Sequence, residues 1–220
     1  MARSPLFPTF DMLPSTLPVF PLPGVLLLPD GDLPLNIFEP RYLAMVDDAL
    51  AGERLIGMGQ PLDPNEEGAR PALYEVGCAG RITSLEETED GRYLITLTGV
   101  CRFRIQQEIA TTRGYRRFGV DWSLFAPDMA PDGDLELDHE RLHRVLKTYF
   151  KQQGISANWE AIQNTPDARL IISLAMICPF APTEKQAILE ADTAQNRADT
   201  VLSLLEIAAY DQADGGVSRH

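Results

Sequence analysis

The amino-acid sequence predicts an α+β fold, with a strand-rich first part followed by a helical second part. Prolines crowd residues 5–40, and because proline fixes φ and lacks an N–H, this stretch favours short extended segments. Apolar and polar residues then alternate along residues 74–105, as they do in half-buried strands. From residue 135 onward the apolar residues instead recur at helical spacing.

The strand-rich part contains one clear helix, which begins at Pro40 and ends at Gly52. We expect extended segments at residues 17–20, 25–28, 33–38, 55–58, 74–85, 92–105 and 115–125. Glu89, Asp90 and Gly91 separate the two longest segments. Glycine readily adopts positive φ, so these residues predict a hairpin turn.

Helix start signals divide the second part. An apolar stripe that ends at Gly154 is formed by Leu142, Val145, Leu146, Tyr149 and Phe150, and it is centred on Leu142, Leu146 and Tyr149. Further helices are expected after Thr165-Pro166, after a capping box at Thr183 to Gln186, and after Asp192. The predicted division is a flexible N-terminus (1–16), a strand-rich region (17–125), a linker (126–134), a helical region (135–211) and a flexible tail (212–220).

Composition narrows the function. The net charge of −13 would repel phosphate backbones and anionic lipids, which argues against nucleic-acid and membrane partners. The three cysteines lie far apart, which favours a reducing, cytoplasmic setting. No apolar run approaches the roughly 20 residues of a membrane span. The sequence contains no GxxxxGK[ST] motif, and we expect no cofactor.

Several segments stand in a recognisable order. They are LPVFPLP (17–23), VLLLP (25–29), LPLNIFEPRY (33–42), YEVGCAGRI (74–82) and GRYLITLTGVCRFR (91–104). Together they resemble the N-terminal domain of Lon ATP-dependent proteases, and the resemblance runs from about Leu17 to Tyr210. The pieces IFEPRY and G-x-x-RF are the most specific.

The resemblance implies a partly closed, PUA-like barrel followed by a small helical bundle. It also implies a non-catalytic module that recognises polypeptides. We expect such a module to act as an adaptor, as a holdase or as a regulator of ATP-dependent proteolysis, with polypeptide substrates or a protease or chaperone as its partners. The chain has no segment resembling the Ser-Lys peptidase site of the Lon family.

The signature segments supply candidate binding residues, which are Phe38, Glu39, Arg41, Tyr42, Arg102 and Phe103. Each has a structural alternative. Phe38 and Tyr42 are expected to pack the lone helix on the strands, Glu39 and Arg41 to fix the strand-to-helix corner, and Arg102 to lie on a solvated strand face. Residues 62–71 and 126–134 are expected to form mobile rims of a polypeptide-binding surface.

A competing enzymatic hypothesis rests on the HExxH motif at residues 139–143. The i, i+4 spacing places His139 and His143 on one helix face, as zinc ligation requires, with Glu140 as a base and Glu160 as a third ligand. The alternative function is therefore a zinc-dependent hydrolase. The charged neighbours of the motif favour two partly exposed histidines instead. RNA binding, a third class suggested by PUA-like folds, is opposed by the acidic charge.

Overall fold

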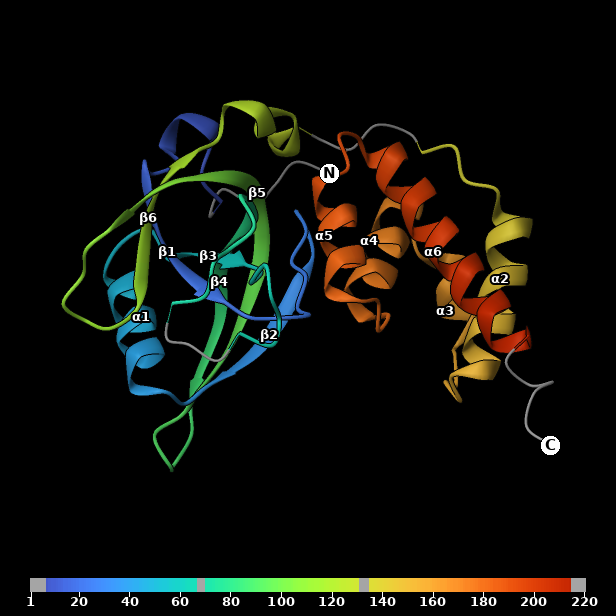
Figure 1. The fold of residues 1–220 in the computed structure, drawn as a ribbon, viewed down its shortest axis with the longest axis horizontal. Coiled ribbons are helices and arrows are strands. Elements are labelled where there is room, and N and C mark those ends of the chain that lie inside the picture. Colours follow the sequence, from blue (N-terminus) through green and yellow to red (C-terminus); the bar gives the residue numbers. More distant parts are fainter. Residues whose placement is uncertain (1–6, 67–69, 131–134, 215–220) are drawn as a thin grey trace. The chain divides into compact units, whose positions relative to one another are not determined.

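The computed structural model describes residues 7–66, 70–130 and 135–214. The chain divides into two compact units, Met1–Pro131 and Asp132–His220 (Figure 1). The first is the strand-rich unit and the second the helical unit, so the α+β prediction is confirmed. No helix within the described ranges is long and apolar enough to cross a membrane.

One mixed sheet forms the strand-rich unit. Its strands are β1 (Thr16–Pro21), β2 (Asp32–Ile37), β3 (Leu55–Gly59), β4 (Val76–Glu87), β5 (Tyr93–Ile109) and β6 (Arg116–Asp121). The strand order is β2-β5-β4-β3-β1-β6, and β6 also pairs with β5. That last pairing closes the five strands β5, β4, β3, β1 and β6 into a barrel, as the PUA-like resemblance implies. Strand β2 stays outside the barrel and pairs only with β5 among the strands described.

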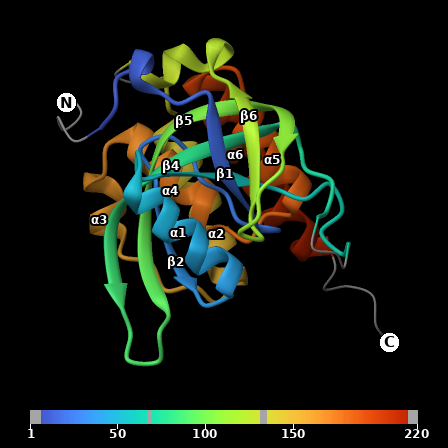
Figure 2. The same ribbon diagram turned by 90° about the vertical axis from the view of Figure 1, so that its left-hand side faces the viewer.

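The long strand β5 therefore belongs to two layers. Its first half pairs with β2 and β4 in a three-stranded layer, and its second half pairs with β4 and β6 in the barrel. The β4–β5 hairpin extends well beyond the barrel in both views (Figure 2). At its turn Gly91 has φ 79°, which confirms the predicted hairpin turn.

Gly99 marks the junction of the two halves of β5. A Cβ atom on Gly99 would lie 1.9 Å from the backbone oxygen of Leu28. Residues 26–28 are buried and belong to no strand, so the expected extended segment at 25–28 does not join the sheet. The chain crosses β5 here, and the residues that follow the segment hydrogen-bond to Gly99: Asp30 N–H donates to Gly99 O, and Gly99 N–H donates to Gly31 O.

Helix α1 (Pro40–Ala51) packs against β1 and β3. The ring of Tyr42 lies 4.2 Å from that of Phe20, measured between centroids. Tyr115 Oη donates to Asp48 Oδ2 over 2.8 Å, which ties the loop before β6 to the helix. Gly52 follows the helix as the sequence predicts.

The helical unit contains α2 (His139–Gln152), α3 (Trp159–Asn164), α4 (Asp167–Ile177), α5 (Pro182–Glu190) and α6 (Ala194–Asp214). The predicted stripe of Leu142, Leu146 and Tyr149 is buried, and α2 packs on α6. Arg141 also reaches α6, where its Nε and Nη2 donate to the two carboxylate oxygens of Glu206 over 2.7 and 2.6 Å.

Three predicted helix starts are wrong by one or two residues. Pro166 is the N-cap of α4, whereas Thr165 ends α3. Ala181 caps α5 because its N–H donates to Glu184, so Thr183 lies inside the helix. Thr193, not Asp192, accepts from the Asn196 N–H at the start of α6. In each case the predicted residue has a side chain that favours an N-cap, but the N-cap in the structure is a neighbouring residue.

The predicted segment boundaries also differ from the structure. Within the expected flexible segment 1–16, Phe10–Met12 form the 3-10 helix η1, and Thr16 begins β1. Within the expected linker 126–134, residues 126–129 belong to the 3-10 helix η2 (Ser123–Met129), which packs on β5. Helix α6 continues to Asp214, past the expected start of the tail at 212. Residues 1–6, 67–69, 131–134 and 215–220 lie outside the described ranges.

Candidate functional site

A shallow groove lies on the outer face of the β2–β5–β4 layer. Pro34 pairs with Thr96 and Thr96 with Ser84, while Asn36 pairs with Leu94 and Leu94 with Glu86. Paired residues on neighbouring strands point to the same face of a sheet, so these side chains line one surface. We call it the outer groove; it has a volume of about 360 Å³ and is lined by Pro34, Leu35, Asn36, Ser84, Glu86, Leu94, Ile95 and Thr96.

Apolar side chains give the outer groove its chemistry. Leu94 is 39% exposed, and Phe38, just beyond the end of β2, is 59% exposed. The Arg92 guanidinium carbon lies 5.7 Å from the centroid of the Phe38 ring, which places both beside the groove. Large exposed apolar side chains that gather at one place are typical of interaction surfaces.

The opposite face of the same layer is part of the core. Ile37, Ile95 and Leu97 are each less than 4% exposed. Leu85 is the exception, because it pairs with Ile95 on this inner face near the hairpin end yet remains 43% exposed. The layer therefore carries one exposed leucine on each face, Leu94 and Leu85.

The predicted residues at the strand-to-helix corner differ in their exposure. Phe38 is exposed, so the expectation that it packs α1 on the strands is wrong, whereas Tyr42 is buried as expected. Arg41 Nη2 lies 2.8 Å from Glu39 Oε2, and the Arg41 guanidinium stacks 4.5 Å from the Tyr42 ring centroid. Burial raises the pKa of the Tyr42 hydroxyl. Glu39 and Arg41 thus fix the entry to α1 while staying partly exposed.

Arg102 and Phe103 are buried, which corrects the expectation that Arg102 lies on a solvated strand face. Arg102 donates from Nε and Nη2 to the two oxygens of Asp128 over 2.9 and 2.8 Å, and Asp128 Oδ2 also accepts from the Arg102 N–H. The ring of Phe103 fills the barrel beside Gly57 and Gly77. These side chains hold the barrel together and do not contribute to the outer groove.

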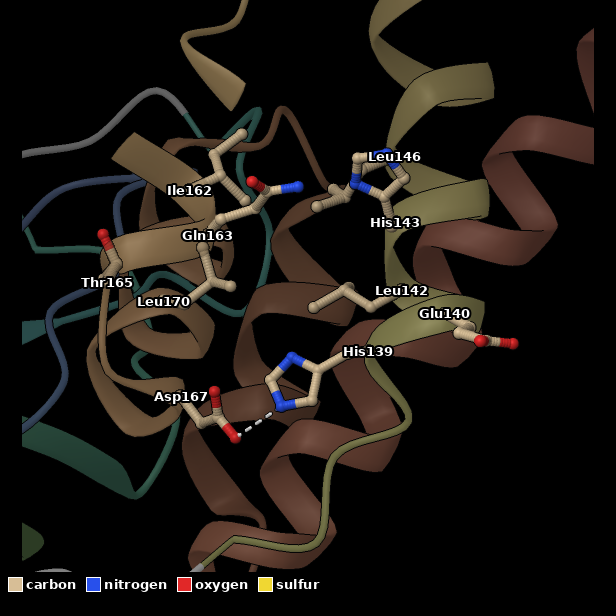
Figure 3. A pocket seen from close by; sticks show the side chains of 10 residues that line it. All are labelled: His139, Glu140, Leu142, His143, Leu146, Ile162, Gln163, Thr165, Asp167 and Leu170. Carbon is tan, nitrogen blue, oxygen red and sulfur yellow. Dashed lines mark ion pairs between the residues drawn. The ribbon is translucent and has the colours of Figure 1, made fainter. Parts of the chain in front are cut away.

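The HExxH helix lines a separate pocket inside the helical unit (Figure 3). His139 Nε2 lies 3.2 Å from Asp167 Oδ2. His143 packs edge-on against Trp159, with ring centroids 4.9 Å apart. Glu140 points away from both imidazoles, so it is not placed to act as the base beside a metal that they would hold (Figure 3).

Metal chemistry finds no support in this arrangement. Within the described ranges, no group of three or more His, Cys, Asp and Glu side chains is placed to hold a metal ion. The predicted third ligand, Glu160, lies in the first turn of α3. The zinc-hydrolase alternative therefore lacks the ligand set that it needs.

Sequence reasoning missed most of the outer groove. The alternation along residues 74–105 predicted a half-buried strand, but it could not show that β2 pairs with β5 and brings Pro34 and Asn36 beside Leu94 and Thr96. The signal was a leucine on an otherwise polar strand face. The meaning of this leucine became clear only from the pairing of β2 with β5, which places Asn36 beside Leu94.

Comparison with known proteins agrees with the fold. The chain matches the model of the ATP-dependent protease La (LON) substrate-binding domain over residues 16–206. It is 26% identical over 199 residues to Lon protease 2 of Myxococcus xanthus, covering 88% of this chain and 24% of that protein. Lon protease 2 of Thermus thermophilus is also 26% identical, with 89% of this chain and 24% of the relative covered.

Two solved structures are similar. A Lon N-terminal domain protein from Xanthomonas campestris has 26% identity and a TM-score of 0.57, covering 86% of this chain and 97% of that one. The N-terminal domain of the Lon protease of the Mycobacterium avium complex has the same TM-score and coverage with 15% identity, and it supports the fold alone.

In chain order, a closed barrel precedes a helical bundle, and a groove lies on the sheet of the first unit. The family match covers most of the chain, and the chain belongs to the Lon substrate-binding domain family. The matched region is the substrate-binding domain and not a catalytic domain. The chain spans about a quarter of the length of the curated Lon proteases that it matches.

Proposed function

We propose that this chain binds unfolded or extended polypeptide through the outer groove. The observation that carries the proposal is the gathering of exposed Phe38 and Leu94 around a groove on the three-stranded layer. Membership of a substrate-binding family supports the same function. Unfolded polypeptides expose the apolar side chains that such a groove takes up.

The groove suits side-chain recognition better than strand addition. Pro34 lies in the middle of the edge strand β2 and has no N–H, so it interrupts the row of donors that an added strand would use. Binding therefore relies on apolar side chains against Leu94 and Phe38. Arg92 and Glu86 provide one charge of each sign beside them, which accommodates polar flanking residues.

Two leucines of the hairpin give a matched test. Leu94→Ala removes an exposed side chain from the groove, whereas Leu85→Ala removes an equally exposed one from the opposite face. Titration of a labelled, permanently unfolded protein should show affinity reduced about five- to ten-fold by Leu94→Ala, roughly 1–1.4 kcal/mol. Equal effects of the two substitutions, or no effect of either, would exclude the outer groove.

We further propose that the chain works in the cytoplasm as an adaptor or regulator of ATP-dependent proteolysis carried out by another protein. The family relationship supports this role, since the relatives matched are named Lon proteases. Adding the chain to such a protease should change the degradation rate of an unfolded substrate, and Leu94→Ala should reduce the change. An unaltered rate across a range of chain concentrations would reject the regulatory role.

A further inference from the structure

The pocket beside the HExxH helix is a small apolar cup with one polar rim. Its volume is about 260 Å³, slightly below the roughly 300 Å³ at which sites for drug-sized ligands begin. Leu142, Leu146 and Leu170 are buried and form part of its wall with the half-buried Ile162. This size and lining suit one large aliphatic or aromatic side chain.

The polar rim is formed by Asp167 and His139. Asp167 lies in the first turn of α4 and lines the pocket. His139 Nε2 lies 3.2 Å from Asp167 Oδ2. The second ring nitrogen of His139 faces toward the leucines of the pocket (Figure 3).

The side chains that line the pocket include acidic groups but no Lys or Arg among the described residues. Asp167 and Glu140 are acidic, His139 and His143 are imidazoles, and neither Lys nor Arg lines it. An occupant that combines an apolar side chain with a nearby positive charge would complement this lining. In a polypeptide, the N-terminal residue joins those two features on adjacent atoms, because its α-ammonium group is one bond away from the carbon that bears the side chain.

We infer that this pocket binds the N-terminal residue of a polypeptide that begins with a large apolar side chain. The side chain enters the leucine-lined cup, and the free α-ammonium group donates to the carboxylate of Asp167 at the rim. This inference extends the proposed polypeptide binding to a second site in the helical unit. It does not use the outer groove, so either site can fail without the other.

The test compares peptides that differ only at their N-terminus. Fluorescence anisotropy of the full chain is measured with a ten-residue peptide that begins with Leu or Phe and carries a C-terminal dye. The same peptides with an acetylated N-terminus lack the charge. We expect the free-amine peptides to bind about ten-fold or more tightly than the acetylated ones, since hydrogen bonds to a charged group are strong.

Variants separate this pocket from the rest of the molecule. Asp167→Asn keeps the size of the side chain and should abolish most of the preference for the free amine. Ile162→Lys places a positive charge at the half-buried wall and should have the same effect, which guards against a folding defect at the start of α4. Glu160→Gln, in the first turn of α3 and outside the lining of the pocket, should leave binding unchanged.

Three results would overturn the inference. They are equal binding of free and acetylated peptides, equally tight binding of an acetylated peptide with an internal Leu-Lys pair, and no binding of any peptide. Leu94→Ala should leave the free-amine preference intact. If Leu94→Ala weakens binding of unfolded protein while the peptides show no preference, the outer groove stands and the N-terminal pocket falls.

Discussion

Both halves of β5 belong to one β-strand, but their surroundings differ. In the half that pairs with β2, Ile95 and Leu97 are buried, while Leu94, Thr96 and Thr98 on the other face are not. In the barrel half, the five consecutive residues Gly99 to Phe103 are all buried. Helix η2 packs on this half of the strand, and Arg102 contacts Phe125 and Asp128 from it.

This difference explains why Phe38 in one signature segment is exposed, whereas Phe103 in the other is buried in the core. Phe38 follows β2, whose layer is covered on one face only, and it is exposed. Phe103 lies where both faces of the strand are covered, and it is buried. An aromatic residue in a family signature is therefore a binding candidate only where the sheet leaves one face open.

Breaking the cover over the barrel half should have the largest effect. Asp128→Ala leaves the buried Arg102 guanidinium without its bidentate partner, which should lower the free energy of unfolding by about 3–5 kcal/mol. Urea denaturation measures it. The double variant Arg102→Met, Asp128→Leu should be more stable than Asp128→Ala, since an apolar pair removes the uncompensated charge. If Asp128→Ala lowers the free energy of unfolding by less than an ordinary surface substitution does, the contact between η2 and β5 does not stabilise the barrel.

Gly99→Ala attacks the junction of the two halves. The new methyl group would overlap the Leu28 backbone, so we expect a loss of about 1–3 kcal/mol from forced displacement. Gly119→Ala in β6 is the control, because its Cβ would meet its nearest neighbour, Gln107 Cγ, at an ordinary 3.5 Å. Thermal denaturation of both variants gives the comparison. If Gly99→Ala and Gly119→Ala have similar melting temperatures, the segment 26–28 can move to accommodate the new methyl group at little cost in stability.

Phe38→Ala tests the open layer. With 59% of Phe38 exposed, the free energy of unfolding should fall by less than about 1 kcal/mol. Phe103→Ala, at the buried counterpart, should cost about 3–5 kcal/mol. The affinity for unfolded protein should fall more for Phe38→Ala than for Phe103→Ala when both variants are measured at temperatures below their unfolding transitions. Equal stability losses would contradict the assignment of Phe38 to the surface.

The smallest effect concerns the far end of β5. Arg116 donates to both oxygens of Glu108 and holds the pKa of that carboxyl below its usual value. A lowered folded-state pKa adds stability above the ordinary carboxyl pKa of about 4.3, and this stability is lost as pH falls through the folded pKa. The pair is partly exposed, so we expect well under about 1 kcal/mol. Glu108→Gln should be less stable than the unaltered chain at pH 7 and equal to it at pH 3 by urea denaturation.

Local patterns predicted the elements well because each was encoded by neighbouring residues. Alternation identified β4 and β5, Gly91 identified their turn, and Pro40 and Gly52 bounded α1. The buried segment 26–28 could not be recognised, because an apolar run looks the same in a strand and in a loop that crosses one. Its path depends on Gly99, which has no side chain and lies 71 positions after Leu28 in the sequence.

The candidate site was harder to predict for the same reason. Phe38 was chosen from a signature segment, and its exposure follows from the end of β2 rather than from its neighbours in sequence. Arg102 was expected to be solvated because arginines usually are, but Asp128 lies in a stretch whose composition suggested a linker. Pairings between distant segments decided both outcomes.

The closure of the barrel has a consequence for synthesis of the chain. Arg117 Nε reaches Thr16 Oγ1 over 3.3 Å although the two residues are 101 positions apart. Strand β1 can therefore find its partner β6 only after most of the first unit has left the ribosome, and such distant pairings form slowly. Asp128 precedes His139, the first residue of α2, so it can pair with Arg102 before α2 has emerged. The strand-rich unit should thus complete its fold during translation, ahead of the helices that follow.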